Sequence, residues 1–175
     1  MGWIMDTYSM FMGHSVPGVV TGKPLDIGGS LGRPEATGRG VMFATREMLK
    51  KHGKKLNEIT VSVQGYGNVG KTAATLLYAE GSKIVAIGDV SCSIRNKAGL
   101  NIPEINDYVA KNGVLKGYKG AGVEEVTTEE LLTCECDVLV PAALENQITE
   151  KIAEKIKASY IVEGANGPTS SEADV

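Results

Sequence analysis

The stretch that decides the fold is ITVSVQGYGNVG, residues 59–70. Its first six residues form a β-branched, apolar run that is typical of a buried strand. The remaining six carry the spacing G-x-G-x-x-G at Gly65, Gly67 and Gly70. Apolar residues then recur at helical spacing over residues 69–80, which predicts a helix. A glycine-rich turn between a strand and a helix is the sequence context that a dinucleotide-binding turn requires.

Each glycine has a physical reason to be there. Gly65 permits a tight turn, Gly67 lets the main chain approach a pyrophosphate, and Gly70 lets the helix pack closely on the strand. Main-chain N–H groups and the helix dipole would then hold the phosphates without a cationic side chain. The alternative is an ordinary tight turn between a strand and a helix.

An acidic residue follows the next predicted strand, KIVAIG at residues 83–88. Asp89 lies 19 residues after Gly70, where a carboxylate can accept hydrogen bonds from an adenosine ribose. A solvated turn aspartate is the alternative. Because Asp89 would repel a 2′-phosphate, the sequence favours NAD over NADP. Arg95, with the serines at positions 91 and 93, could hold a 2′-phosphate instead, so NADP or dual use stays open.

The rest of the chain continues the alternation of strands and helices. Further strands are predicted at 137–140 and 160–162, with helices at 101–111, 129–132 and 149–157. Near-continuous apolar strands indicate burial on both faces. The predicted fold class is α/β, a Rossmann-type open, mostly parallel sheet with helices on both faces.

A different segment precedes this unit. Residues 2–12 have apolar residues at helical spacing, and residues 13–34 form a Gly/Pro-rich hinge with short extended pieces. A further helix is predicted at 36–52. We therefore expect a leading helix and hinge loop at 1–34 and a dinucleotide-binding domain at 35–175. The apolar face of the first helix, with Trp3 and Phe11, needs a partner.

Composition narrows the function classes. The 175 residues are 42% apolar and 22% charged, with a net charge of −3, which is a globular balance without the basic excess of a nucleic-acid binder. No apolar run approaches the roughly 20 residues that cross a membrane, and no secretory signal is visible. We expect a cytoplasmic protein that contacts neither nucleic acid nor membrane. The cysteines at 92, 134 and 136 are expected to be reduced thiols, and with two histidines no metal site is expected.

Motifs along the whole chain resemble the middle of hexameric glutamate dehydrogenases. They occur in that family's order and run as follows: TGKP at 21–24, GGSLGR at 28–33, ATGRGV at 36–41, GYGNVG at 65–70, CDVLVPAA at 136–143 and EGANGPT at 163–169. The related leucine, phenylalanine and valine dehydrogenases share the architecture, but their equivalents of the first and last runs differ.

The resemblance implies roles at the nicotinamide end of the cofactor. Thr37 would bond the carboxamide, Arg33 would lie beside the ring, and Asn166 would contact the nicotinamide ribose. Ala142 and Ala143 would line the cofactor cleft. The alternatives are a loop-organising arginine at 33 and a simple turn asparagine at 166.

The resemblance also implies roles at the other end of the cofactor. Tyr66, Gly67, Asn68 and Val69 would contact the pyrophosphate and ribose. Asp89 and Val90 would contact the adenosine ribose.

The implied activity is the oxidative deamination of L-glutamate to 2-oxoglutarate and ammonia with NAD(P). In the family, the catalytic lysine and aspartate and the substrate-binding lysines lie upstream of this stretch, and their motifs do not occur here. We therefore expect no catalytic residue, an absent substrate domain and an inactive isolated chain. We also expect a homohexamer only at full length, and a monomer or weakly associated chain alone.

Two other functions stay open. One is a stand-alone dinucleotide-binding or regulatory module without catalysis. The other is a related branched-chain or aromatic amino-acid dehydrogenase, which the quoted motifs disfavour. The runs at 37–41 and 166–169 favour an enzyme domain, because a simple sensor needs no contacts on the nicotinamide side.

Overall fold

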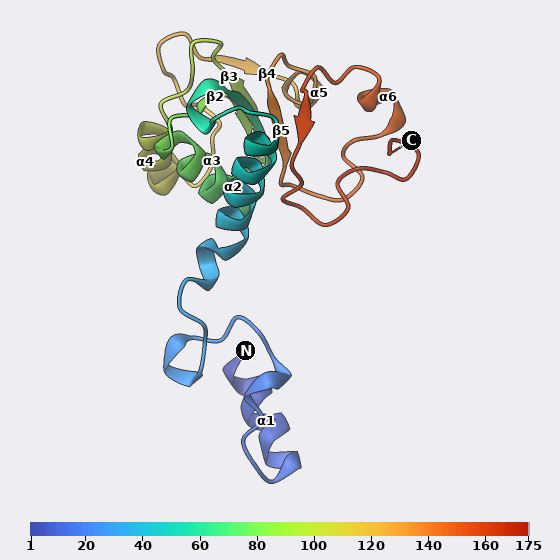
Figure 1. Cartoon of the computed structure of the whole chain (residues 1–175). Coiled ribbons are helices and arrows are strands. Elements are labelled where there is room, and N and C mark those ends of the chain that lie inside the picture. The colour runs from blue at the N-terminus through green and yellow to red at the C-terminus, as the bar shows by residue number, and fades with distance from the viewer. Residues whose placement is uncertain (175) are drawn as a thin grey trace. The chain divides into compact units, whose positions relative to one another are not determined.

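The computed structural model describes residues Met1–Asp174. Its contacts divide the chain into two compact units, Met1–Ala36 and Thr37–Val175 (Figure 1). The division falls within helix α2, which spans Arg33–Lys51 and starts three residues before the predicted position 36. No helix of Met1–Asp174 combines the length and the apolar character needed to cross a membrane.

The first unit is a helix followed by a loop. Helix α1 spans Gly2–Met12, as predicted, and ends at Gly13, whose φ of 72° is in the left-handed region that glycine adopts without strain. The loop contains two short 3-10 helices, Pro17–Val19 and Leu25–Ile27. Trp3 and Phe11 are 91% and 86% exposed. The apolar face of α1 is therefore uncovered within its own unit.

The second unit is built on a six-stranded open sheet in the order β4-β3-β2-β1-β5-β6. The strands are β1 Thr60–Gln64, β2 Lys83–Gly88, β3 Ser93–Arg95, β4 Glu124–Val126, β5 Val138–Pro141 and β6 Tyr160–Ile161. Strand β1 pairs in parallel with β2 and with β5, and β5 pairs in parallel with β6. The predicted α/β fold with its parallel strands is confirmed. Strands β3 and β4, which join antiparallel beyond β2, were not predicted.

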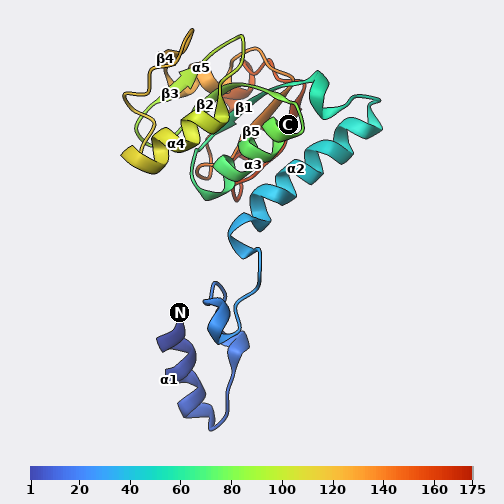
Figure 2. The ribbon, with the colours of Figure 1, turned by 90° about the vertical axis from the view of Figure 1, so that its left-hand side faces the viewer.

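Helices cover both faces of the sheet, as Figure 2 shows. Alternation along β1 explains this, because Val61 and Val63 pack into one core while the hydroxyl of Ser62, on the other face, donates to the Leu131 carbonyl at 3.0 Å. The first core takes side chains from α2, α3 and α4, and the second takes them from α5. The helices besides α2 are α3 Asn68–Ala79, α4 Ile102–Asn112, α5 Thr128–Leu132 and α6 Glu150–Ala153.

Helix α6 is shorter than the predicted 149–157. Beyond Ala153 the main chain tightens, because Lys155 N–H donates to Ile152 and Ile156 N–H donates to Ala153, three residues back. Ile156 packs against the second core. The tight turn places this apolar side chain inward and leaves only residues 157–159 to reach β6.

Helices α2 and α3 meet at Gly38. A Cβ added to Gly38 would lie 2.5 Å from the Thr72 Cβ and 2.7 Å from the Val69 carbonyl oxygen. Both distances are shorter than a Cβ atom can approach its neighbours, so the crossing requires a residue without a side chain. Gly40, on the same helix, is exposed and has nothing within 4 Å of its added Cβ.

The two glycines of α2 should therefore respond oppositely to alanine. We expect Gly38→Ala to lower the free energy of unfolding by about 1–3 kcal/mol through overpacking. Gly40→Ala should raise it by about 0.5–1 kcal/mol through helix propensity. Urea unfolding followed by circular dichroism measures both. Equal effects of the two substitutions would show that the crossing is not close.

Candidate functional site

The glycine turn lies at the edge where the parallel strands end. Gly65 follows β1 directly and has a φ of 91°. Its N–H donates to the carbonyl of Gly88, at the end of β2, at 2.8 Å. On its other side, an added Cβ would lie 2.6 Å from the carbonyl oxygen of Ala142, which follows β5. The turn is thus held between the ends of both neighbouring strands, with no room for a side chain.

The other two glycines of the motif differ sharply in their surroundings. A Cβ on Gly70 would lie 1.8 Å from the Gly65 carbonyl oxygen, so α3 packs directly on the turn. Gly67 is exposed, with nothing within 4 Å of its added Cβ. It is the N-cap residue of α3. Because glycine has no side chain, nothing from residue 67 covers the helix N-terminus, and an anion can approach the first-turn N–H groups.

Tyr66 points away from this opening. Its ring is buried, and its hydroxyl donates to the Asn106 Oδ1 atom of α4 at 2.9 Å. Asn106 in turn donates to the Thr75 hydroxyl of α3 at 3.0 Å. Burial raises the pKa of Tyr66 above its usual value, so the ring stays neutral. Only the main chain of Tyr66 is available to a ligand, whereas Asn68 is exposed and Val69 is half-buried at the start of α3.

Asp89 is bound to the protein through both carboxylate oxygens. Oδ1 accepts from the Ser91 N–H at 2.7 Å, the Ser91 hydroxyl at 2.5 Å and the Cys92 N–H at 3.1 Å. Oδ2 accepts from the Leu115 N–H at 2.7 Å. Burial opposes ionisation of Asp89, but these hydrogen bonds outweigh it and lower its pKa. Asp89 therefore fixes the loop before residue 115, a structural task that its sequence position did not reveal, and the adjacent Val90 is fully exposed.

Arg95 is not available beside Asp89. It lies on β3 opposite Ala86, and its guanidinium forms an ion pair with Glu124 of β4 at 2.9 Å. The antiparallel course of β3 carries it away from the strand ends that Asp89 marks. The main chain of another basic residue is nearer, because the Lys116 N–H donates to the Ser91 hydroxyl at 3.0 Å. No pattern in the sequence indicates this contact, since Lys116 lies 27 positions after Asp89.

The loops after β5 and β6 meet α2 and α3 at Gly164. A Cβ on Gly164 would lie 3.0 Å from the Ala142 Cβ, 3.2 Å from Val69 Cγ1 and 3.4 Å from Val41 Cγ2. Its N–H donates to the Pro141 carbonyl at 2.9 Å. Four segments far apart in sequence therefore converge around one small residue, Gly164, whose role no local pattern in the sequence indicates.

The remaining predicted residues of the second unit differ in exposure. Ala142 is half-buried, whereas Thr37, Ala143 and Asn166 are exposed. Thr37 directly precedes Gly38, which packs on the first turn of α3. The loop that carries Asn166 is tied to the loop after β5, because the Asn146 N–H donates to Gly167 at 2.9 Å. Arg33 belongs to the other unit and is exposed.

Gln64, at the end of β1, is hydrogen-bonded to the loop after β5. Its Nε2 atom donates to the Gln147 Oε1 atom at 2.9 Å, and the Gln147 amide donates to the Glu145 carbonyl at 3.2 Å. Within residues 1–174, the buried Oε1 atom of Gln64 has no hydrogen-bond partner. The arrangement fixes the loop that carries Ala142 and Ala143.

No group of three or more metal-ligating side chains occurs within residues 1–174. The site therefore consists of an open helix N-terminus, a carboxylate at the neighbouring strand end and a set of converging loops. This arrangement can bind an elongated anionic molecule across the carboxyl edge of the sheet.

Comparison with known proteins decides the family. The family model described as Glutamate/Leucine/Phenylalanine/Valine dehydrogenase matches residues 28–175. This chain belongs to that family. It is 46% identical over 174 residues to glutamate dehydrogenase A2 of Halobacterium salinarum, and it spans 41% of that relative's length.

Solved structures of family members agree with the fold. A hetero-hexameric glutamate dehydrogenase from Thermus thermophilus in its Leu bound form superposes with a TM-score of 0.86 at 36% identity. The glutamate dehydrogenase of Peptoniphilus asaccharolyticus superposes with a TM-score of 0.75 at 35% identity. Each match covers 99% of this chain and 40% of the other. The chain therefore corresponds to about two fifths of these longer dehydrogenases.

The hydrogen bonds of Asp89 predict a pH-dependent stability. Because the folded-state pKa of Asp89 is lowered, its contribution is complete above the unfolded value of about 3.9 and is lost as the pH falls through the folded value. We expect Asp89→Asn to reduce the free energy of unfolding at neutral pH by about 1–3 kcal/mol. The difference from the unsubstituted chain should shrink below pH ~4.

Urea unfolding at neutral and acidic pH measures this difference. Asp107→Asn is the matched control, because Asp107 is exposed on α4 and should give a small change at both pH values. A pH-independent effect of Asp89→Asn would show that the charge of Asp89 does not contribute.

Proposed function

We propose that the second unit binds a nicotinamide dinucleotide and is the cofactor-binding domain of a glutamate dehydrogenase. The observation that carries the proposal is the open N-terminus of α3 at Gly67, flanked by the carboxylate of Asp89 at the neighbouring strand end. Family membership and the names of the relatives support the same assignment.

The pyrophosphate would lie at the first turn of α3. N–H groups there point toward the opening, and the helix dipole adds a partial positive charge of roughly half a unit. Gly67, Asn68 and Val69 would contact the phosphates and ribose, and Tyr66 would take part through its main chain. Gly65 and Gly70 would support the site by allowing the turn and the close packing of the helix.

The adenosine ribose would lie beside Asp89 and Val90. The Oδ2 atom of Asp89 accepts one hydrogen bond from the protein while Oδ1 accepts three, so Oδ2 retains the capacity to accept from a ribose hydroxyl. A negative charge here disfavours a 2′-phosphate, and Arg95 is engaged by Glu124. We therefore propose NAD as the preferred cofactor. NADP or dual use would depend on Lys116 rather than on Arg95.

The nicotinamide end would lie where the loops after β5 and β6 approach α2. Thr37 would bond the carboxamide, Asn166 would contact the ribose, and Ala142 and Ala143 would line the cleft, with Arg33 contributing from the leading segment. The bound nicotinamide supplies the hydride acceptor for oxidation of the substrate. The chain's own residues bind and orient that cofactor.

The substrate of the complete protein would be L-glutamate, with 2-oxoglutarate and ammonia as products. This chain spans about 41% of the relative's length. The residues around the proposed site would orient the cofactor. We assign none of them to proton transfer with the amino-acid substrate. We therefore propose that the isolated chain has negligible turnover, that the complete protein is a cytoplasmic homohexamer, and that its substrate domain lies elsewhere. An assay with glutamate and NAD tests the first point.

Binding measurements on three glycine variants test the function. We expect Gly67→Ala to weaken NAD binding at least tenfold, because its methyl group occupies the approach to the phosphates, while the free energy of unfolding changes little. Gly70→Ala should impair both binding and stability, because its Cβ collides with the Gly65 carbonyl. Gly18→Ala, in the leading unit and with nothing within 4 Å of its added Cβ, should leave binding unchanged.

Titration calorimetry with NAD, NADP and ADP-ribose completes the test. A stronger response to NAD than to NADP is expected from Asp89. A stand-alone adenine-nucleotide sensor would bind ADP-ribose as tightly as NAD and would not respond to Thr37→Ala. Undiminished NAD binding by Gly67→Ala would refute the proposed site.

A further inference from the structure

A second cavity lies at the opposite edge of the sheet from the glycine turn. It has a volume of about 490 Å³. Thr60 is the first residue of β1, Cys136 and Asp137 directly precede β5, and Ser159 directly precedes β6, so the cavity lies at the amino ends of the parallel strands. Nothing in the proposed cofactor site involves these residues.

Two cysteines line this cavity. Cys134 and Cys136 both line it, both are free thiols, and they are only 6% and 8% exposed. The main chain bends at residues 134 and 135, between helix α5 and strand β5. Only Glu135 separates the two cysteines in the chain, and both line the same cavity, so the two thiols share one small space.

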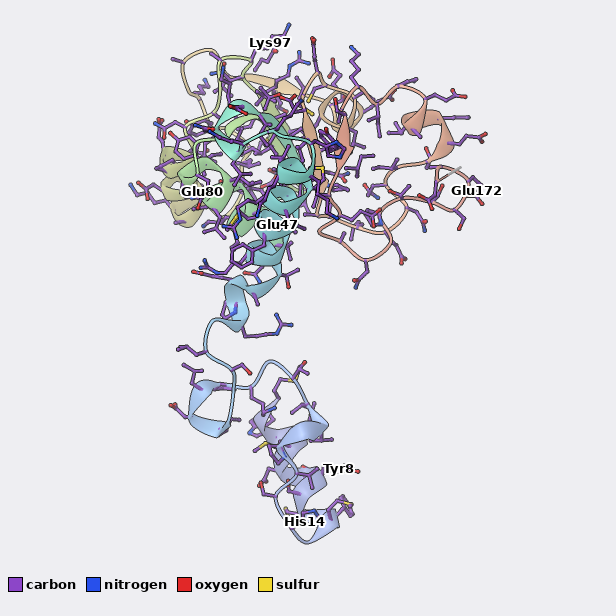
Figure 3. The ribbon with its side chains drawn as sticks, in the orientation of Figure 1. Tyr8, His14, Glu47, Glu80, Lys97 and Glu172 are labelled. Atoms are coloured by element: carbon purple, nitrogen blue, oxygen red, sulfur yellow. The ribbon has the colours of Figure 1, made fainter. Side chains whose placement is uncertain are left out.

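The surroundings of the two sulfurs differ. The interaction between the two thiols lowers the pKa of Cys134 and raises the pKa of Cys136, and burial adds to the rise at Cys136. Arg95, which lines the same cavity, adds a favourable charge for a Cys134 thiolate. Lys97 and Lys157 also line the cavity, and Lys97 projects outward from the second unit in Figure 3.

Acidic groups in the cavity oppose the thiolate only in part. Glu135 and Asp137 both line it. The carboxylate of Asp137 accepts from the Thr60 N–H and hydroxyl at 2.8 Å each and pairs with Lys54 at 3.4 Å, so its charge is largely compensated. The pair is therefore set up as one nucleophilic sulfur beside one thiol.

We propose that Cys134 and Cys136 form a dithiol redox site that reacts with small disulfides and closes into an intrachain disulfide. The Cys134 thiolate attacks one sulfur of the small disulfide, forms a mixed disulfide and releases one thiolate. The Cys136 thiol then loses its proton and attacks Cys134 Sγ, which releases the second small thiol. The protein loses two electrons and two protons, and the small disulfide is reduced to two thiols.

The third cysteine provides an internal comparison. Cys92 is more exposed than the pair, but burial and the nearby Glu125 and Asp89 raise its pKa. If exposure alone governed reaction, Cys92 would react first. If the paired arrangement governs it, Cys134 reacts first.

Reaction with oxidised glutathione, followed by mass spectrometry of the intact chain and its peptides, tests the proposal. We expect the unsubstituted chain and Cys92→Ser to lose two hydrogens and to yield a peptide linked between Cys134 and Cys136. Cys136→Ser should stop at one glutathione on Cys134. Cys134→Ser should react at least tenfold more slowly at Cys136. Circular dichroism shows that each variant is folded, and the doubly substituted Cys134→Ser/Cys136→Ser chain gives the background at Cys92.

Two results would overturn the proposal. One is the absence of a Cys134–Cys136 link in the folded, unsubstituted chain after excess oxidised glutathione. The other is faster reaction at Cys92 than at Cys134 in the folded chain. In each case the two thiols would be ordinary buried cysteines, and the cofactor proposal would be unaffected.

Discussion

The close packing of helix α3 on the turn that precedes it is the constraint on which the site depends. At Gly70 the helix main chain approaches the Gly65 carbonyl so closely that an added Cβ would lie 1.8 Å from that oxygen. This approach places the N-terminus of α3 directly above the end of β1. A side chain at either glycine would push the helix outward and would move its first-turn N–H groups away from the strand ends.

Other close approaches extend the same constraint across the carboxyl edge of the sheet. Gly38 lets α2 cross α3, and Gly164 lets the loop after β6 reach Val69 and Ala142. Gln64 adds a hydrogen bond to Gln147 beneath the loop after β5. The opening at Gly67 is thus bordered by elements whose close approach depends on Gly38, Gly65, Gly70 and Gly164.

The local parts of this structure could be predicted from sequence, because each is encoded within a short window. The run at 59–70 contains both the strand pattern and the glycine spacing, and the later strands are apolar and bounded by polar residues. Strands β3 and β4 escaped prediction because each has only three residues and owes its conformation to its neighbour in the sheet. Helix α6 was overestimated because an apolar pattern at 149–157 does not distinguish an α-helix from a tightened turn.

Long-range relations around the site were less accessible. Their closeness in sequence suggested that Arg95 lies beside Asp89. Because β3 runs antiparallel to β2, Arg95 instead forms an ion pair with Glu124. The partner of Asp89 Oδ2 is the N–H of Leu115, 26 residues away. The burial of Tyr66 against Asn106 likewise depends on how α4 packs on α3. None of these contacts leaves a periodic signal in the sequence, so only the folded chain shows them.

The two edges of the sheet differ in chemistry, and this difference allows a direct measurement. Main-chain amide resonances can be followed by two-dimensional NMR while NAD is added to the chain. Binding at the glycine turn predicts the largest shifts at the amides of residues 66–70, with smaller shifts near residues 89 and 142. Largest shifts around residues 134–137, with none at the turn, would contradict the account.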